Sequence, residues 1–245
     1  MEDLEGFKKK IESDIKRYET GSVILLPFLD EAKGYIVEEL CNKYKVIYYK
    51  NGGIINSSKN RYLLTQYDYD DSYFKIKKYQ IIYNKKYYEI KHKNVLGSLM
   101  SLGIKRETIG DIIINDNNDI YFSCTEEISK FLEEEFNYCG NTPISLKEID
   151  YDITNNIKFI EKDLFVSSLR LDCVLSSVYN ISRSKILEEI MNSNVFVNYV
   201  SNLNPSHNLK LDDIINLRHK GKFKIGEING TSRSGRIHIK VLIWS

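Results

Sequence analysis

The sequence predicts an α+β chain of three modules, and three observations support this fold class. Segments with apolar residues at helical spacing are interleaved with segments in which apolar and polar residues alternate. A length of 245 residues fits two or three compact modules rather than one small domain. Charge also divides along the chain, because residues 163–245 carry 11 basic and 7 acidic side chains whereas 79–162 carry 10 and 14. We therefore expect modules at 1–72, 75–155 and 163–245.

The first module, residues 1–72, is predicted to be a small α/β unit. Asp30 precedes the second of its helical patterns and is the expected N-cap. Glycines and an asparagine mark a turn after the first strand pattern, and a tyrosine-rich acidic stretch then interrupts the periodicity. The expected elements are helices over 7–18 and 30–42, a strand over 44–49, a turn at Asn51-Gly52-Gly53 and a linker over 67–73.

The second module, residues 75–155, shows a clearer order of elements. They are a strand or hairpin over 79–91, a helix over 94–102, strands over 112–114 and 120–122 joined at Asn117-Asn118, a helix over 128–137 begun by a capping box of Ser123 and Glu126, and a strand over 143–149. This order is that of the split βαβ, ferredoxin-like sandwich, which RNA-recognition motifs (RRMs) also use. The fold hosts many functions, so RNA contact and a purely structural role both stay open for this module.

The third module, residues 163–245, is predicted to pack two short helices on a small sheet. Apolar residues fall at i, i+3, i+4 and i+7 in the first helix, and Ser182 is expected to cap the second. The expected buried residues are Leu171, Val174, Leu175 and Val178 in the first helix and Ile186, Leu187, Ile190 and Met191 in the second. The expected strands are 195–198, 209–218, 222–228 and 236–244, with the last two joined through Asn229-Gly230 and a tip rich in serine and arginine.

Basic residues concentrate in this last module. The stretch from Arg218 to Lys240 contains seven basic residues and Glu227 as its one acid, which favours a polyanionic partner over a merely solvated strand face. Arg183 and Lys185 fall in the first turn of the second helix, where the helix dipole disfavours cations unless an anion lies close by. We interpret this helix start as a phosphate site; two exposed surface charges are the alternative.

Several motifs of this module occur in the order and spacing of a known RNA-binding domain. They are Arg170-Leu171-Asp172, Ser182-Arg183-Ser184-Lys185, Val197-Asn198, Asp213-Ile214, Arg218 and Gly221-Lys222-Phe223. Residues 165–245 thereby resemble the domain named after ribosomal small-subunit protein S-four, the alpha-L motif. The resemblance implies that the two-helix surface grips the backbone of structured RNA. The implied contacts are Arg170, Arg183, Ser184, Lys185, Asn198, Arg218 and Lys222, and charge and position alone add Arg233 and Arg236.

Upstream motifs narrow the resemblance further. They are His92-Lys93-Asn94-Val95-Leu96-Gly97, Leu102-Gly103-Ile104-Lys105-Arg106 and Gly110-Asp111-Ile112, together with Phe28-Leu29-Asp30 and Gly52-Gly53. These are similar to the YlmH family, bacterial S-four-domain proteins encoded among cell-division genes. Glu31, Asn60 and Asn94 depart from the family pattern. The resemblance implies binding of ribosomal or transfer RNA on the large ribosomal subunit, in translation or ribosome-associated quality control.

Other classes of function find less support in the sequence. A pseudouridine synthase would need a catalytic Asp domain in addition to the three expected modules. A methyltransferase would need a glycine-rich cofactor loop, but Gly52-Gly53 is the only glycine pair in the sequence. Four scattered histidines and four cysteines show no metal-ligand spacing, and the cysteines are expected to be free thiols of a reducing cytoplasm. We expect a monomeric RNA binder without catalytic residues, cofactor, metal or membrane span. An RNA-modifying enzyme and a cell-division adaptor are the alternatives.

Overall fold

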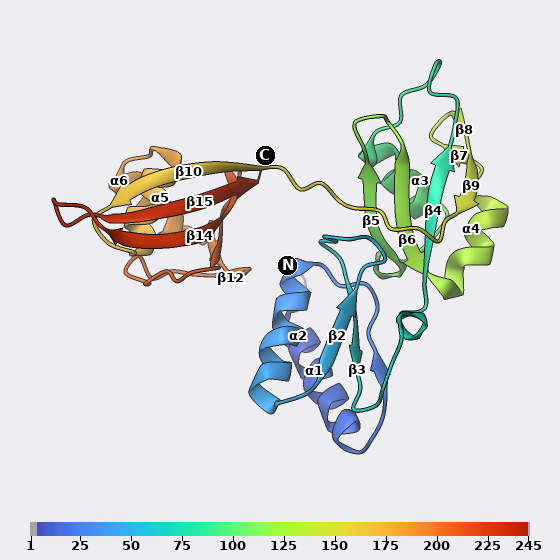
Figure 1. Cartoon of the computed structure of the whole chain (residues 1–245), viewed down its shortest axis with the longest axis horizontal. Coiled ribbons are helices and arrows are strands. Elements are labelled where there is room, and N and C mark those ends of the chain that lie inside the picture. The colour runs from blue at the N-terminus through green and yellow to red at the C-terminus, as the bar shows by residue number, and fades with distance from the viewer. Residues whose placement is uncertain (1–3, 245) are drawn as a thin grey trace. The chain divides into compact units, whose positions relative to one another are not determined.

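The chain divides into two compact units, residues 1–156 and 157–245, and the computed structural model describes residues 4–244 (Figure 1). Both units combine helices with antiparallel sheets, so the predicted α+β class is confirmed. The predicted first and second modules pack together in the first unit, and their boundary at 72–75 stays a prediction. Among residues 4–244, no helix has the length and apolarity that crossing a membrane requires.

The first half of this unit packs two helices against a three-stranded antiparallel sheet with the order β1-β3-β2. Asp30 caps the second helix as predicted, because its Oδ1 accepts a hydrogen bond from the Lys33 N–H at 2.9 Å. Ile11, Ile15, Val37 and Leu40 form the centre of its core. The elements are α1 (Leu4–Glu19), β1 (Ile24–Leu25), α2 (Glu31–Tyr44), β2 (Tyr48–Asn51) and β3 (Arg61–Leu64).

Two expectations for this half were wrong. The strand placed at 44–49 begins only at Tyr48, because α2 continues to Tyr44 and ends at Lys45, which has a left-handed φ of 57°. The central strand β3 was missed: all four of its residues are buried, so it shows no alternation of apolar and polar side chains.

The second half of the unit is a four-stranded antiparallel sheet with the order β5-β6-β4-β9. Its elements follow the predicted order of strand, helix, strand, strand, helix, strand. The main elements are β4 (Ile76–Ile82), α3 (His92–Ser101), β5 (Ile109–Ile114), β6 (Ile120–Thr125), α4 (Ser129–Glu135) and β9 (Ser145–Glu148). Short 3-10 turns lie at Asp71–Phe74 (η1), Arg106–Thr108 (η2) and Glu126–Ile128 (η3), and β7 (Tyr138–Cys139) pairs with β8 (Thr142–Pro143).

The capping box predicted at Ser123 and Glu126 does not form. Ser123 lies inside β6, which pairs with β4 as far as Thr125, and its buried hydroxyl has no hydrogen-bond partner among the residues described. The helix therefore starts later, at Ser129, after the η3 turn. The strand expected over 79–91 is likewise only β4, which ends at Ile82.

One face of this four-stranded sheet is covered by segments of the same unit. Ile54, from the loop after β2, and Ile153 pack with Ile113 and Ile149, and Tyr121 adjoins this cluster. Gly53 has a φ of +75°, and a Cβ there would lie 2.7 Å from Ile76 Cγ2. The Asn51-Gly52-Gly53 loop is therefore pressed onto the sheet, and this face of β4, β5 and β6 is not an open platform for stacking bases.

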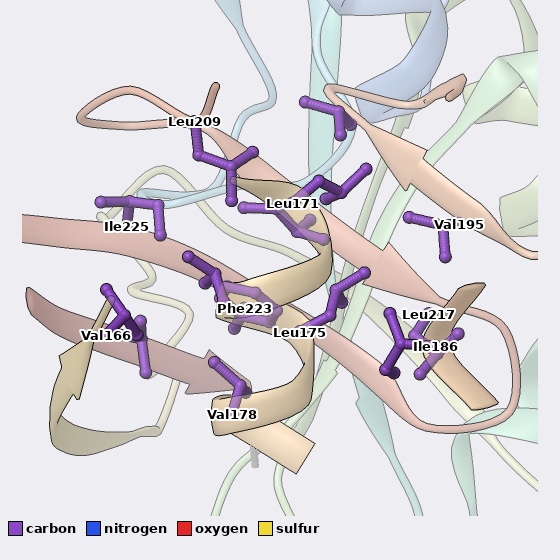
Figure 2. Close-up of a cluster of buried hydrophobic side chains, with 14 of the residues drawn as sticks. Val166, Leu171, Leu175, Val178, Ile186, Val195, Leu209, Leu217, Phe223 and Ile225 are labelled. Carbon is purple, nitrogen blue, oxygen red and sulfur yellow. The ribbon is translucent and has the colours of Figure 1, made fainter. Parts of the chain in front are cut away.

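The second unit packs two helices on a six-stranded antiparallel sheet with the order β10-β15-β14-β13-β11-β12. Phe223 and Ile225 of β14 meet Leu171, Leu175 and Val178 of the first helix in its core (Figure 2). The elements are β10 (Phe159–Val166), α5 (Leu171–Tyr179), α6 (Arg183–Met191), β11 (Val195–Val197), β12 (Val200–Ser201), β13 (Ile214–Leu217), β14 (Gly221–Thr231) and β15 (Ile237–Trp244).

Several details of this unit differ from the sequence-based expectation. Leu187 and Met191 are exposed, because only the Ile186 and Ile190 face of α6 meets the core. Strand β14 continues through Asn229-Gly230, so the hairpin turn lies only in the predicted tip rich in serine and arginine, at 232–236. Strand β13 begins at Ile214 rather than Leu209. Strand β10 was not expected, and it pairs along its whole length with β15.

Candidate nucleic-acid interface

The two helices of the second unit meet at a short connection that presents basic side chains. Asn180 ends α5 with a left-handed φ of 53°, and α6 begins at Arg183. Ser182 occupies the N-cap position, but its hydroxyl lies 3.2 Å from Ser184 Oγ instead of capping the helix. Arg183, Ser184 and Lys185 are all exposed on the first turn. The predicted placement of these three residues at the helix start is what the structure shows.

A buried carboxylate holds two of the predicted arginines. The side chain of Asp172 is 2% exposed, and it accepts hydrogen bonds from Arg170 Nε at 3.0 Å, Arg170 Nη2 at 3.1 Å and Arg183 Nη2 at 2.6 Å. Its own α5 adds the N–H of Cys173 at 2.9 Å. Burial opposes ionisation of Asp172, but the hydrogen bonds from Arg170 and Arg183 outweigh it and lower its pKa to about 2. We call these three residues the Asp172 triad.

The Asp172 triad changes the interpretation of the helix start. A cation in the first turn of α6 was expected to indicate an external anion, but for Arg183 the chain itself supplies that anion through Asp172. Arg170 and Arg183 still expose 42% and 54% of their side chains. Two arginines on one carboxylate leave a net charge of +1, so the triad is both a structural element and a fixed positive surface.

Beside the triad lies a groove of about 540 Å³ that brings together residues distant in the sequence. Lys185 of α6 and Arg218 after β13 line it, and His219 and Lys220 extend its basic side. Glu189 is its one lining acid, and that carboxylate accepts a hydrogen bond from Asn194 Nδ2 at 2.7 Å. We call this the basic groove; its lining carries three permanent positive charges against one negative charge.

Arg218 is oriented by its neighbours in the basic groove. Its guanidinium carbon lies 5.8 Å from the centroid of the Phe196 ring, and its Nη1 lies 3.5 Å from Asn194 Oδ1. Both contacts leave the residue exposed. A stacked arginine keeps most of its hydrogen-bond donors free to turn towards a phosphate.

The remaining predicted residues do not line the basic groove. Asn198 has a φ of 48°, and its amide is engaged locally, donating to Asp213 Oδ1 and accepting from the Ile214 N–H, each at 2.9 Å. The Lys222 ammonium lies 4.6 Å from the centroid of the Trp244 ring. Arg233 and Arg236 are exposed in the turn between β14 and β15.

Sequence reasoning missed three residues of this surface. Asp172 lies in the Arg170-Leu171-Asp172 motif, but a lone Asp two residues after an Arg carries no signal that it is buried. Lys220 belongs to the basic stretch from Arg218 to Lys240 but was not predicted as an RNA contact, and His219 lies between it and Arg218. In the part of the chain that the structure describes, no group of three or more His, Cys, Asp and Glu could hold a metal ion.

Comparison with known proteins agrees with an RNA-related role. Residues 70–153 match the family model described as "Putative RNA-binding domain in YlmH". A curated relative, the "Ribosome-associated protein quality control protein P2" of Bacillus subtilis (strain 168), is 27% identical over 86% of this chain and 84% of its own length. The chain is thus similar to proteins named for RNA binding and ribosome quality control, and neither name is that of an enzyme.

A solved structure supports the fold. The "Cell division protein ylmH from Streptococcus pneumoniae" matches with a TM-score of 0.53 and 24% identity, over 61% of this chain and 93% of that one. The family model carries the name YlmH over residues 70–153, and the solved structure agrees with the fold, so the chain is similar to YlmH proteins, as the sequence resemblance indicated.

Proposed function

We propose that the protein binds structured RNA, ribosomal or transfer RNA, through the unit at 157–245, which we assign to the S-four type. The observation that carries the proposal is the convergence of the basic groove with the Asp172 triad. Together they present Arg170, Arg183, Lys185, Arg218 and Lys220 against the acids Asp172 and Glu189. The basic groove carries a net charge of +2 and the Asp172 triad adds +1, which favours a polyanion, and Arg held in a fixed orientation favours phosphate.

We further propose that the partner is the large ribosomal subunit and that the protein acts there, as a monomer in the cytoplasm, in translation or ribosome-associated quality control. The name of the Bacillus subtilis relative supports this context. The unit at 157–245 holds its RNA contacts on two helices and one sheet, and it contributes binding rather than chemistry.

The test is binding of transfer RNA and ribosomal RNA fragments to the full chain at two salt concentrations. The variant Lys185→Ala with Arg218→Ala removes two phosphate contacts and leaves the Asp172 triad intact. Each lost contact lowers the slope of log affinity against log salt by roughly one, so we expect a slope smaller by about two and an affinity at least tenfold weaker.

A matched control removes the same charge elsewhere. Lys130→Ala with Lys210→Ala changes two exposed lysines that do not line the basic groove. This variant should bind RNA almost as the unaltered chain does. Equal losses in the two double variants would show that net charge, rather than the groove, governs binding. Unchanged RNA binding in the groove variant would show that the RNA site lies on another surface.

A further inference from the structure

A second concave site lies inside the first unit, between its two halves. Two adjoining pockets of about 400 and 210 Å³ share Asp30, Lys59 and Arg106 as lining residues. The lining comes from the loop before α2 and the start of that helix, the loop before β3, α3, the η2 turn and β5. The motifs at 92–97, 102–106 and 110–112, together with the Phe28-Leu29-Asp30 motif, all contribute residues to it, and the basic groove uses none of them.

Hydrogen bonds between the two halves of the unit hold this site in shape. The Phe28 N–H donates to the Glu107 carbonyl at 2.9 Å, and the Lys59 ammonium donates to the Ile109 carbonyl at 3.1 Å. The Ser58 N–H donates to Asp111 Oδ2. These three hydrogen bonds hold the pocket in one shape, so binding of a ligand would lose little conformational entropy of the protein.

The larger pocket is a cationic lobe. Four basic side chains line it, those of Lys33, Lys59, Lys105 and Arg106, with Asp30 and Glu107 as its acids. Burial and the neighbouring charge of Arg106 lower the pKa of Lys59, while the charges of Asp111 and Asp30 oppose that change. Positive groups are therefore close enough to repel one another, and an anion between them would relieve that repulsion.

The smaller pocket is an acidic lobe with three carboxylates against two bases. Asp30, Glu31 and Asp111 line it together with His92, and Lys59 and Arg106 are shared with the cationic lobe. Burial raises the pKa of Asp111, while hydrogen bonds from the backbone of Ser58 and Lys59 oppose that rise. Burial and the charge of Arg106 lower the pKa of His92, so its imidazole is neutral at pH 7. The lobe offers acceptors to a ligand that carries N–H groups.

We propose that this two-lobed pocket binds one nucleotide, with its phosphate in the cationic lobe and the amino-bearing edge of its base against the carboxylates of the acidic lobe. Carboxylates accept hydrogen bonds from exocyclic amino groups of bases, as Asp and Glu do with cytosine N4. Lys and Arg clusters hold phosphate. The nucleotide is an unpaired residue of RNA or a free nucleotide. The proposal extends the proposed function, and it depends on RNA binding only if the nucleotide is a residue of RNA.

The test is hydrogen exchange of the full chain, measured by mass spectrometry, with AMP, GMP, CMP, UMP, inorganic phosphate and a single-stranded oligonucleotide as probes. Backbone amides at 57–60 and 104–111 report on the pocket, whereas those at 182–194 and 217–221 report on the basic groove. The two RNA-contacting surfaces are therefore read separately, and failure of one is distinguishable from failure of the other.

We expect nucleotides with an amino group to protect 57–60 and 104–111 and to bind at least tenfold more tightly than inorganic phosphate, with UMP weaker. The variant Lys105→Ala with Arg106→Ala changes two exposed residues and should weaken that binding at least tenfold. Lys130→Ala with Lys147→Ala, also exposed and outside the pocket, should leave it unchanged.

Protection by both the oligonucleotide and free nucleotides would assign the site to RNA, and protection by free nucleotides alone would assign it to a small ligand. Inorganic phosphate binding as tightly as the nucleotides would overturn the role of the acidic lobe and with it the proposal. Absence of protection at both segments with every probe would overturn it as well, whatever the basic groove does.

Discussion

Removing Arg183 should destabilise the second unit, because Asp172 would lose one of the arginine hydrogen bonds that keep it charged. The pKa of Asp172 falls from 3.8 to about 2 in the folded chain. At roughly 1.4 kcal/mol per pKa unit this corresponds to about 2.5 kcal/mol of stability at neutral pH. Arg183 supplies the shortest of the three arginine bonds. We expect Arg183→Ala to cost about 1 to 2 kcal/mol, since a buried carboxylate left with one arginine partner loses much of the compensation for its burial.

Trp244 makes the measurement simple. It is the single tryptophan of the chain, it lies in β15 of the second unit, and its ring packs 5.0 Å from that of Phe159. Urea unfolding followed by tryptophan fluorescence therefore reports this unit alone. Arg233→Ala is the matched control, because Arg233 is an exposed arginine of the β14–β15 turn, and its removal should change the unfolding free energy by less than about 0.5 kcal/mol.

The lowered pKa of Asp172 also predicts how the unfolding free energy changes with pH. The folded pKa of Asp172 lies below its unfolded value, so the stabilisation is present above about pH 4 and is lost as pH falls from about 4 towards 2. In Arg183→Ala the pKa of Asp172 rises, and less stability remains to be lost over that range. A second variant, Asp172→Asn in the Arg183→Ala background, should reveal a coupling of about 1 kcal/mol in a double-mutant cycle.

Two outcomes would refute this reasoning. An unfolding free energy within about 0.5 kcal/mol of that of the unaltered chain would show that Arg183 is only a surface charge, the alternative that the sequence left open. Equal acid sensitivity of the two proteins would show that Asp172 does not depend on Arg183. Because this prediction gives Arg183 a structural role, RNA binding is better tested through Lys185 and Arg218.

Two further predictions concern packing. Gly53→Ala should destabilise the first unit by about 1 to 3 kcal/mol in thermal or urea unfolding, because φ is +75° and the new Cβ would meet Ile76. In the control Gly97→Ala, the new Cβ in α3 meets open space, and the variant should be more stable by up to about 1 kcal/mol. Equal effects of the two substitutions would show that the loop at Gly53 is not packed against the sheet. Ile190→Ala should cost about 2 to 5 kcal/mol and Met191→Ala less than about 0.5, as read by Trp244 fluorescence, and a reversal would return Met191 to the core.

Local patterns in the sequence were enough for much of the element order. The stripe of Leu171, Val174, Leu175 and Val178 predicted α5, and the Asp30 cap predicted the start of α2. These features depend on side chains three or four residues apart, which any single helix brings together. The resemblance to the YlmH family was also found on short motifs that are contiguous in the sequence.

Pairing between strands that are distant in the sequence was harder to predict. Strand β10 pairs with β15 about 80 residues later, and an inward position of β10 holds Lys162, whose ammonium donates to the Val178 carbonyl at 2.8 Å. That lysine breaks the apolar alternation that would have marked the strand. The boundaries of β6 and α4 were also wrong, because pairing with β4 carries β6 through Ser123 to Thr125.

By itself the sequence determined the α+β class, the basic character of the last third and the helices that carry Arg183 and Lys185. Only the tertiary structure decided that Asp172 is buried beneath Arg170 and Arg183, that Lys185 meets Arg218 in one groove, and that Lys59, Arg106 and Asp111 share a pocket. The physical reason is that burial and electrostatic coupling depend on distances in space between segments far apart in the chain, whereas periodicity records only which face of a single element is apolar.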